Sequence, residues 1–424
     1  MKLPLKNRSD KRNPSLEEHP VPKKRRPKRF KRPAVPRKKR EFHFSFLSKI
    51  SPRLALLILF AVIVVSAGIF VLVSTLMEKE KEEAPEYDPQ SDFYSEGNKE
   101  YEFDIPDVSS GYSYYKFDSS TLFEYTGDVD ILSFNQIVAY TSRAFDGDEN
   151  AKEIDSRSLT AKEFWDVLEA LYEKGYIILS PNDIVEETVA FDGSTQIKVK
   201  SLLLPKNRIP IVLIFQDLDY SPDSGYADGL IINKNGDIWS QSTDENGNDV
   251  LSPELDVITL LDKFVSYHPD FSFNGAKGCI AITGQDGVLG FNTQSSNKDE
   301  ENRQYEIAYA KTVVSRLKNT GWSFACHTYS HIDIAGSEYT TVVSDITKWV
   351  NEVGPIVGST KVFVYPESDT REAVLPVKEG DTYNYLLDLG FEIFAASGNA
   401  SALENLGSGS AVLCTYMIFD GYAL

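Results

Sequence analysis

An uncharged apolar segment divides this chain of 424 residues into two parts of opposite charge. Residues 54–77 form a run of 24 uncharged, mostly apolar residues, and about 20 are enough to cross the hydrocarbon core of a membrane. Residues 1–53 hold nineteen Lys or Arg and four Asp or Glu, a formal charge of +15. The remaining chain holds twenty-five basic and fifty-nine acidic residues, a formal charge of −34. The segment therefore predicts a single transmembrane helix with a separate domain on one side.

The charge on the two flanks predicts the orientation of this helix. Basic residues precede it and an acidic run follows Met77, so the positive-inside rule places the N-terminus in the cytoplasm and the rest outside. A cleaved signal peptide is the alternative, but the apolar run is too long for one and the basic arm exceeds a normal n-region. The arm also resembles a nucleic-acid patch, although attraction to anionic lipid headgroups is simpler so close to the span. The charge of −34 argues against a nucleic-acid partner.

Composition predicts four parts in order. Residues 1–53 are a disordered basic cytoplasmic arm, because they are rich in Pro, Lys and Arg. Residues 54–77 are the transmembrane helix, and residues 78–128 are an acidic extracellular stalk without sustained periodicity. Residues 129–424 are the folded domain. Its three cysteines are few and odd in number, so they predict no disulfide framework.

Strand-like and helix-like segments alternate along the outer domain. Apolar runs predict strands, and amphipathic segments between them predict helices, with Thr160 and Glu163 forming a capping box and a further helix beginning at Ser252. Asn235 and Gly236 predict a hairpin turn. The predicted strands are 131–138, 176–179, 209–215, 278–282, 322–325, 362–365, 391–395 and 412–416. This alternation is typical of an α/β fold with a parallel sheet or barrel.

Polar side chains follow three of these strands, and such strand ends are where chemistry gathers in a parallel barrel. His327 and His331 follow one strand, and imidazoles four residues apart converge on one metal if the backbone turns helically. A surface loop with two incidental histidines is the alternative. Asp217 follows another strand, and one carboxylate with two imidazoles is a set that binds a divalent ion with open positions. Cys326 is expected to be buried and apolar, with a soft metal ligand as the alternative.

The outer domain resembles the polysaccharide deacetylases of the NodB-homology type, carbohydrate esterase family 4, in a clostridial-type membrane-anchored branch. The resemblance runs from about residue 130 to the C-terminus. It rests on five stretches: 141–148, 214–220, 278–290, 327–331 and 363–366.

The resemblance implies a distorted (β/α) barrel of about seven strands. Such enzymes use a metal-bound water to remove N- or O-acetyl groups from cell-wall or chitin-like sugars. Carried over by position, Asp217, His327 and His331 fall on the metal ligands, with Zn²⁺ expected and Co²⁺ or Ni²⁺ as alternatives. The implied substrate-binding residues are Tyr365, Pro366 and Glu367.

The sequence departs from the family pattern at the groups that move protons. Gln216 occupies the place of the general-base carboxylate, and an amide cannot take a proton from water, a loss worth ~10²–10⁴-fold in rate. Asp219 is close in sequence, although the resemblance does not assign it that role. Asn135 stands where this branch has a histidine, and no histidine follows His331.

These features leave three functional hypotheses. The first is a membrane-anchored extracellular metal-dependent carbohydrate deacetylase that acts on cell-wall polysaccharide or peptidoglycan. The second is a catalytically inactive relative that binds glycan or a wall-assembly partner. The third is a single-pass sensor or scaffold, which rests only on the basic arm and the stalk.

Overall fold

The computed structural model describes residues 114–424 except 192, 219, 221–224, 245–246, 367–368, 375–379, 408 and 422–424. The predicted cytoplasmic arm, the predicted span at residues 54–77 and most of the predicted stalk lie outside these residues. Within the described residues, no helix has the length and apolarity that a membrane crossing requires.

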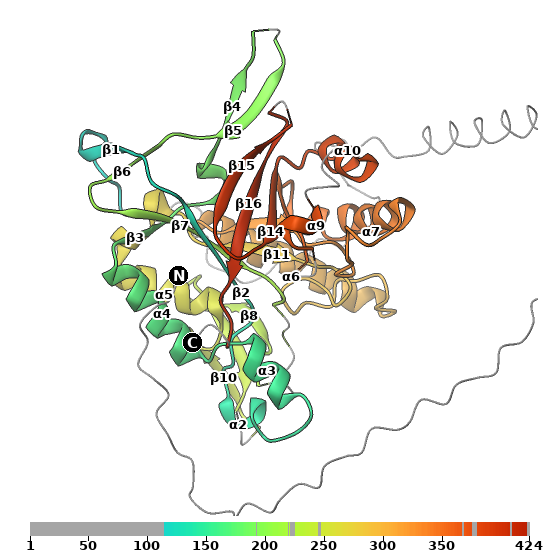
Figure 1. Cartoon of the computed structure of the whole chain (residues 1–424). Coiled ribbons are helices and arrows are strands. Elements are labelled where there is room, and N and C mark those ends of the chain that lie inside the picture. The colour runs from blue at the N-terminus through green and yellow to red at the C-terminus, as the bar shows by residue number, and fades with distance from the viewer. Residues whose placement is uncertain are drawn as a thin grey trace, which may run out of the picture. The chain divides into compact units, whose positions relative to one another are not determined.

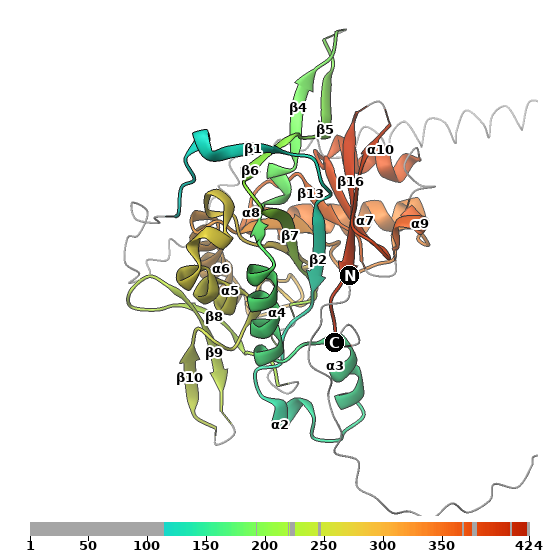
Figure 2. The same ribbon diagram turned by 60° about the vertical axis from the view of Figure 1, so that its left-hand side comes forward.

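Seven parallel strands close into a barrel, as predicted. The ring runs β11-β12-β13-β14-β16-β2-β7, and β7 pairs with β11 to close it. β3 (Tyr176–Ile178) pairs with the first residues of β7, before β11 pairs with the last ones. Figures 1 and 2 show β16 beside β2, which joins the last strand of the ring to the first. The ring strands are β2 (Asp130–Phe134), β7 (Ile209–Phe215), β11 (Cys279–Ile282), β12 (Ser323–Cys326), β13 (Val362–Val364), β14 (Ile393–Ser397) and β16 (Ala411–Ile418).

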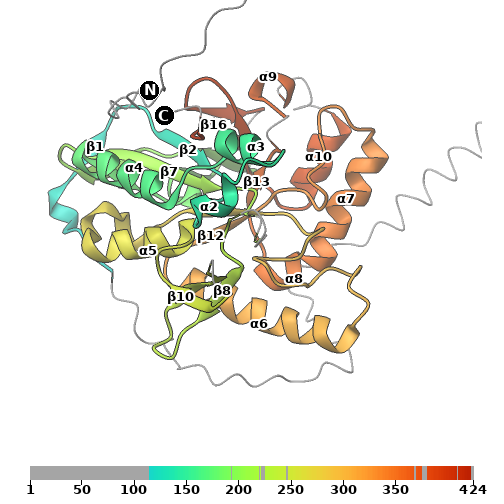
Figure 3. The same ribbon diagram turned by 90° about the horizontal axis from the view of Figure 1, so that it is seen from below.

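Helices surround the strands when the molecule is seen from below (Figure 3). Their bounds are α2 (Thr141–Ala144), α3 (Ala151–Arg157), α4 (Ala161–Glu173), α5 (Val257–Tyr267), α6 (Glu300–Asn319), α7 (Tyr339–Glu352), α8 (Gly354–Val357), α9 (Arg371–Val374) and α10 (Asp381–Asp388). Short 3-10 turns occur at η2 (Ser119–Thr121), η3 (Pro181–Asp183), η5 (Pro269–Phe271) and η6 (Phe273–Gly275). The capping box of Thr160 and Glu163 at the start of α4 is present as predicted.

The predicted start of the helix after residue 250 is wrong. Residues Asp249–Ser252 form β10, which pairs antiparallel with β9 (Ile238–Thr243). Ser252 is therefore the last residue of a strand and does not begin a helix. The helix α5 begins at Val257, because the Asp256 side chain caps it by accepting from the Ile258 N–H. The predicted hairpin turn is confirmed, since β8 (Gly229–Ile232) pairs antiparallel with β9 across Asn235 and Gly236.

One further hairpin, one antiparallel strand and one pair of strands distant in sequence decorate the barrel. β4 (Val185–Val189) and β5 (Thr195–Val199) form a hairpin that projects away from the ring in Figures 1 and 2. β15 (Ala402–Leu406) pairs antiparallel with β16. β1 (Leu122–Tyr125) pairs with β6 (Leu202–Pro205). β1 thus belongs to residues 78–128, which the sequence assigned to the stalk, and it pairs with a strand of the folded domain.

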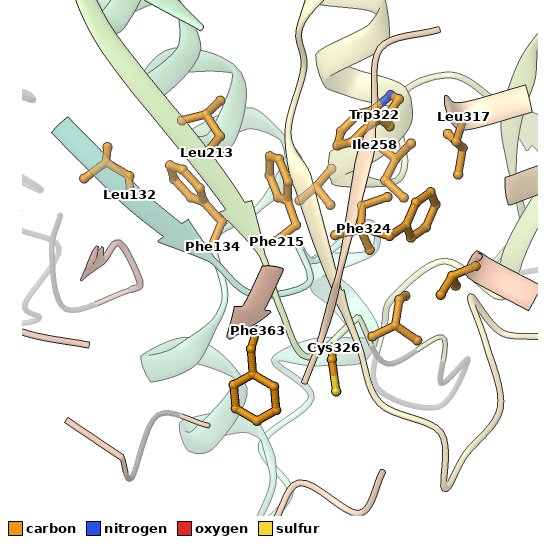
Figure 4. Packing of buried hydrophobic residues seen from close by; sticks show 14 of the residues in the cluster. Leu132, Phe134, Leu213, Phe215, Ile258, Leu317, Trp322, Phe324, Cys326 and Phe363 are labelled. Atoms are coloured by element: carbon orange, nitrogen blue, oxygen red, sulfur yellow. The ribbon is translucent and has the colours of Figure 1, made fainter. Parts of the chain in front are cut away.

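Side chains along each ring strand alternate between two apolar layers, as a strand period of two requires. The inner layer contains no residue of an α-helix. It is built mostly from Val, Ile, Ala, Cys and Leu together with Tyr416, and residues of β5 and β6 add to those of the ring strands. The outer layer packs the strands against the helices. Figure 4 shows this outer layer, with Cys326 among Phe324 and Phe363.

Candidate metal centre

Asp217, His327 and His331 converge at one end of the barrel. Asp217 lies just beyond β7, and both histidines lie just beyond β12. One ligand atom of each residue lies within 4.8 Å of the others. The Nε2 atoms of His327 and His331 lie 3.6 and 3.2 Å from Asp217 Oδ1, and the two rings are 4.9 Å apart. The three residues that the sequence singled out thus face a common point.

His327 is held in the tautomer that a metal ligand requires. Its side chain is fully buried, and Nδ1 donates to the carbonyl oxygen of Val364 at 2.8 Å. A proton on Nδ1 leaves the lone pair on Nε2. In the described part of the chain Nε2 is buried and has no hydrogen-bond partner. A buried polar atom without a partner is costly, and a bound cation facing Asp217 would offset that cost.

The Asp217 carboxylate faces the two histidines with one oxygen and the Arg157 guanidinium with the other. Its backbone has a left-handed φ of 49°, which is uncommon away from glycine and occurs at functional sites. Oδ1 faces the two histidines, while Oδ2 accepts from Arg157 Nη2 at 2.8 Å. Burial raises the pKa of the carboxyl, but hydrogen bonds and charge from the two histidines, when their Nε2 atoms carry protons, lower the pKa by more than burial raises it. Asp217 is therefore ionised as a metal ligand must be.

Sequence reasoning missed Arg157. It ends α3, sixty residues before its partner, and its backbone carbonyl accepts from Asn135 Nδ2 at 3.2 Å. Nothing near Arg157 in the sequence predicts this pairing, because it depends on how α3 packs near the end of β2. Asn135 thus contributes to the site indirectly, by holding the end of α3.

The histidine loop is not helical, so the condition set from sequence for convergence of the two rings is wrong. Thr328 and His331 have left-handed φ values of 60° and 54°. An irregular loop with two left-handed residues, rather than one helical turn, brings the imidazoles together. The Ile332 N–H donates to Thr328 Oγ1 at 3.1 Å, which ties the two halves of the loop.

Gln216 faces the interior of the barrel. It is fully buried, and its Oε1 accepts from the Tyr416 hydroxyl at 3.2 Å. The same hydroxyl lies 3.2 Å from the backbone carbonyl of Tyr365. The side chain at the general-base position is therefore a buried amide that is hydrogen-bonded to Tyr416. Asp219 and Glu367, the other predicted catalytic and substrate-binding carboxylates, lie outside the described residues.

The remaining predicted residues are buried. The Tyr365 ring packs against Phe363 and Phe394 in the outer layer, and Pro366 is buried beside it. Cys326 is fully buried in the same layer, and burial raises the pKa of its thiol. In the described range, one group of three potential ligand side chains lies close enough together to bind a metal ion. It consists of Asp217, His327 and His331 and does not include Cys326.

These residues fit a divalent ion. One carboxylate oxygen and two imidazole nitrogens are ligands that zinc takes in catalytic sites, where further positions stay open for water and substrate. The hydrogen bond from His327 Nδ1 to Val364 and the ion pair between Asp217 and Arg157 hold these two side chains in the orientation that metal binding requires. The fold and the site together define a (β/α) barrel with a candidate metal centre at its strand ends.

Comparison with known proteins agrees with this class. Residues 289–386 match the family model described as polysaccharide deacetylase. Over these residues the chain therefore matches the class of hydrolase that the sequence predicted. No curated protein matches the sequence.

Several solved structures of deacetylases are similar to this chain at low identity. The Streptococcus pyogenes deacetylase PplD in complex with acetate is 13% identical, with a TM-score of 0.36, over 70% of this chain and 94% of its own. IcaB from Ammonifex degensii is 14% identical, with a TM-score of 0.34, over 64% of this chain and 84% of its own. A de-N-acetylase from Aggregatibacter actinomycetemcomitans is 13% identical, with a TM-score of 0.35, over 70% and 96%.

Proposed function

We propose that this protein is a membrane-anchored extracellular deacetylase that uses a divalent metal, with zinc as the expected ion, to remove acetyl groups from cell-wall or chitin-like polysaccharide. The buried Nε2 of His327 carries the proposal, because it has no hydrogen-bond partner in the described residues and faces Asp217 and His331. The polysaccharide deacetylase match over residues 289–386 supports the substrate class. Membrane anchoring and the outside location rest on the apolar segment 54–77 and the charges beside it.

The chain's own residues hold and orient the ligands. A divalent ion at this site supplies polarisation of an acetyl carbonyl and acidification of water. The Val364 carbonyl fixes the His327 tautomer, and Arg157 fixes the Asp217 carboxylate so that one oxygen faces the histidines. Gln216 cannot act as a base, because an amide does not take a proton from water, and its oxygen accepts from Tyr416 inside the barrel. Turnover therefore depends on the metal site with little help from that position.

The orientation of Gln216 also favours a second candidate function. A buried amide in the place of the base is what a catalytically inactive relative would carry. Such a protein would bind acetylated glycan or a wall-assembly partner at the same end of the barrel. The two candidates share the metal site and differ in whether acetate is released.

Acetate release separates the two candidates. Full-length protein in detergent is incubated with Zn²⁺ or Co²⁺ and with acetylated chito-oligomers or peptidoglycan fragments. The enzyme hypothesis expects acetate, and it expects His327→Ala to abolish both acetate release and metal binding. The matched control is His268→Ala, because His268 packs on the rings of Tyr172 and Phe264, away from the candidate ligands.

Three outcomes contradict parts of the proposal. Absence of metal binding in the wild-type protein rejects the metal site. Tight metal binding without acetate, with activity appearing in Gln216→Asp, supports the inactive relative instead. Protease treatment of intact cells tests the location of residues 129–424. If added protease leaves these residues uncut in intact cells but cuts them after the cells are lysed with detergent, the outside placement is contradicted.

A further inference from the structure

Two buried carboxyl groups bind the backbone of the histidine loop, one just before His331 and the other just after it. Asp345 lies in α7 and Asp369 lies just beyond β13, so neither is a neighbour of the histidines in sequence. Asp369 is fully buried and Asp345 is 9% exposed. Neither belongs to the candidate ligand set.

Each carboxylate accepts hydrogen bonds from two consecutive backbone N–H groups of the loop. Asp345 accepts from Tyr329 N at 2.6 Å and from Ser330 N at 3.0 Å, just before His331. Asp369 accepts from Ile334 N at 2.7 Å and from Ala335 N at 2.8 Å, just after it. An ionised carboxylate on a pair of successive N–H groups forms charge-assisted bonds, which are short and strong. Burial and the neighbouring Asp333 raise the pKa of Asp369 to about 7, so its two bonds are charge-assisted above that pH and are ordinary hydrogen bonds below it.

These four bonds act on a loop that has an unfavourable backbone. Thr328 and His331 both adopt left-handed φ, and such residues each cost on the order of 1–3 kcal/mol unless the surroundings impose them. The loop has few regular backbone hydrogen bonds of its own, although the carbonyl of Tyr329 accepts from Gly284 and Gln285. The carboxylates therefore impose the shape in which the His331 ring faces His327 and Asp217.

We propose that Asp345 and Asp369 are positioning residues that hold the loop 327–335 in its metal-binding shape before the ion arrives. This inference rests on the proposed metal site. A loop that is preformed loses no conformational freedom when the ion binds, so its affinity is higher than that of a mobile loop. Groups that hold metal ligands in place through hydrogen bonds typically contribute about 10–100-fold in metal affinity.

The test is calorimetric titration of Co²⁺ into full-length protein carrying Asp345→Asn or Asp369→Asn. Asn keeps the size of the side chain but accepts with only one oxygen, so each variant loses one of the two bonds. We expect Co²⁺ affinity to fall roughly tenfold or more in each, with a changed visible absorption spectrum of the bound Co²⁺. Asp345→Ala should lose more affinity than Asp345→Asn.

The control is Asp262→Asn, which removes a carboxylate that also forms contacts between distant segments. Asp262 accepts from Trp322 Nε1 and pairs with Lys277, and both partners lie just before the N-terminal ends of β11 and β12. This is the opposite end of the barrel from the metal ligands. The control should lose stability without losing Co²⁺ affinity.

Hydrogen exchange of the wild-type protein tests preformation without any variant. The amides of Tyr329, Ser330, Ile334 and Ala335 should be protected from exchange to the same degree with and without Co²⁺. Protection that appears only with Co²⁺, or Asn variants that fold and bind Co²⁺ as tightly as wild type, would overturn the inference. Failure of the wild type to bind Co²⁺ would instead reject the proposed metal site, and this inference with it.

Discussion

Replacing Asp256 by Asn is expected to change how the free energy of unfolding depends on pH. Asp256 is fully buried, and it accepts from Ile258 N at 2.8 Å and from Gln136 Nε2 at 3.2 Å. Burial raises the pKa of this carboxyl to about 7, although the Ile258 N–H opposes the shift. The folded protein therefore keeps a proton that the unfolded chain releases near the ordinary carboxyl pKa of ~3.9.

The magnitude follows from this difference in proton binding. Between roughly pH 4 and pH 7 the folded state binds more protons at Asp256 than the unfolded state, so stability from this group falls as pH rises. Each pH unit over which the folded state holds the extra proton corresponds to ~1.4 kcal/mol. Between pH 5 and pH 8 this holds for about two units, from pH 5 to the folded-state pKa of about 7. Asp256 should then cost about 3 kcal/mol more at pH 8 than at pH 5.

Asn removes this cost while keeping the cap of α5. Its side-chain oxygen can still accept from Ile258 N, and Gln136 can turn its amide so that Oε1, which has no hydrogen-bond partner among the described atoms, accepts from the new amide. Urea unfolding of full-length wild type and Asp256→Asn at pH 5, 6, 7 and 8 measures the difference. We expect the variant to gain about 3 kcal/mol on the wild type across that range.

The control is Gln136→Ala, which removes a hydrogen bond but keeps the carboxyl. It should be less stable than wild type at every pH, and its stability should still fall as pH rises, because the carboxyl of Asp256 is retained. If the stability difference between wild type and Asp256→Asn is the same at pH 5 and pH 8, Asp256 is not protonated in the fold and the reasoning is refuted.

Three further changes test other parts of the structure. Gly321→Ala should destabilise the protein by at least ~2 kcal/mol in thermal unfolding, because φ is +100° and a Cβ would lie 1.8 Å from the backbone oxygen of Gly275; an unchanged melting temperature would contradict this. Tyr416→Phe should cost ~1–3 kcal/mol in urea unfolding, since it removes the donor to two buried acceptors inside the barrel; a stability equal to wild type would refute that role. Cys326→Ala should leave Co²⁺ affinity unchanged, because the thiol lies in the outer apolar layer, and a weaker titration would show it to be a ligand.

The barrel strands could be predicted from the sequence because each is a short apolar run bounded by turn residues. The run 209–215 is almost entirely apolar, and it becomes β7, a strand with neighbours along both edges. Convergence of Asp217, His327 and His331 followed from placing polar residues at strand ends. The start of α5 did not, because Ser252 and Pro253 look like a helix start, and pairing with β9 overrides that local preference.

The groups that support the metal ligands could not be predicted, since each acts through contacts between distant segments. Arg157 reaches Asp217 from α3, and Asp345 reaches the loop from α7. Their residue types are ordinary for a helix surface. The left-handed backbone of Thr328 and His331 is equally invisible in sequence, because neither residue is a glycine.

The neighbouring positions of β2 and β16 in the ring have a consequence for folding during synthesis. β2 is the first strand of the ring to be made and β16 is the last, yet they pair with each other. All three candidate metal ligands leave the ribosome before β16 does, and until β16 arrives β2 and β14 keep unpaired edges that invite aggregation. Closing a ring between such distant segments is intrinsically slow. A chain interrupted before residue 411 would therefore carry its candidate ligands on an open sheet with two unpaired edges.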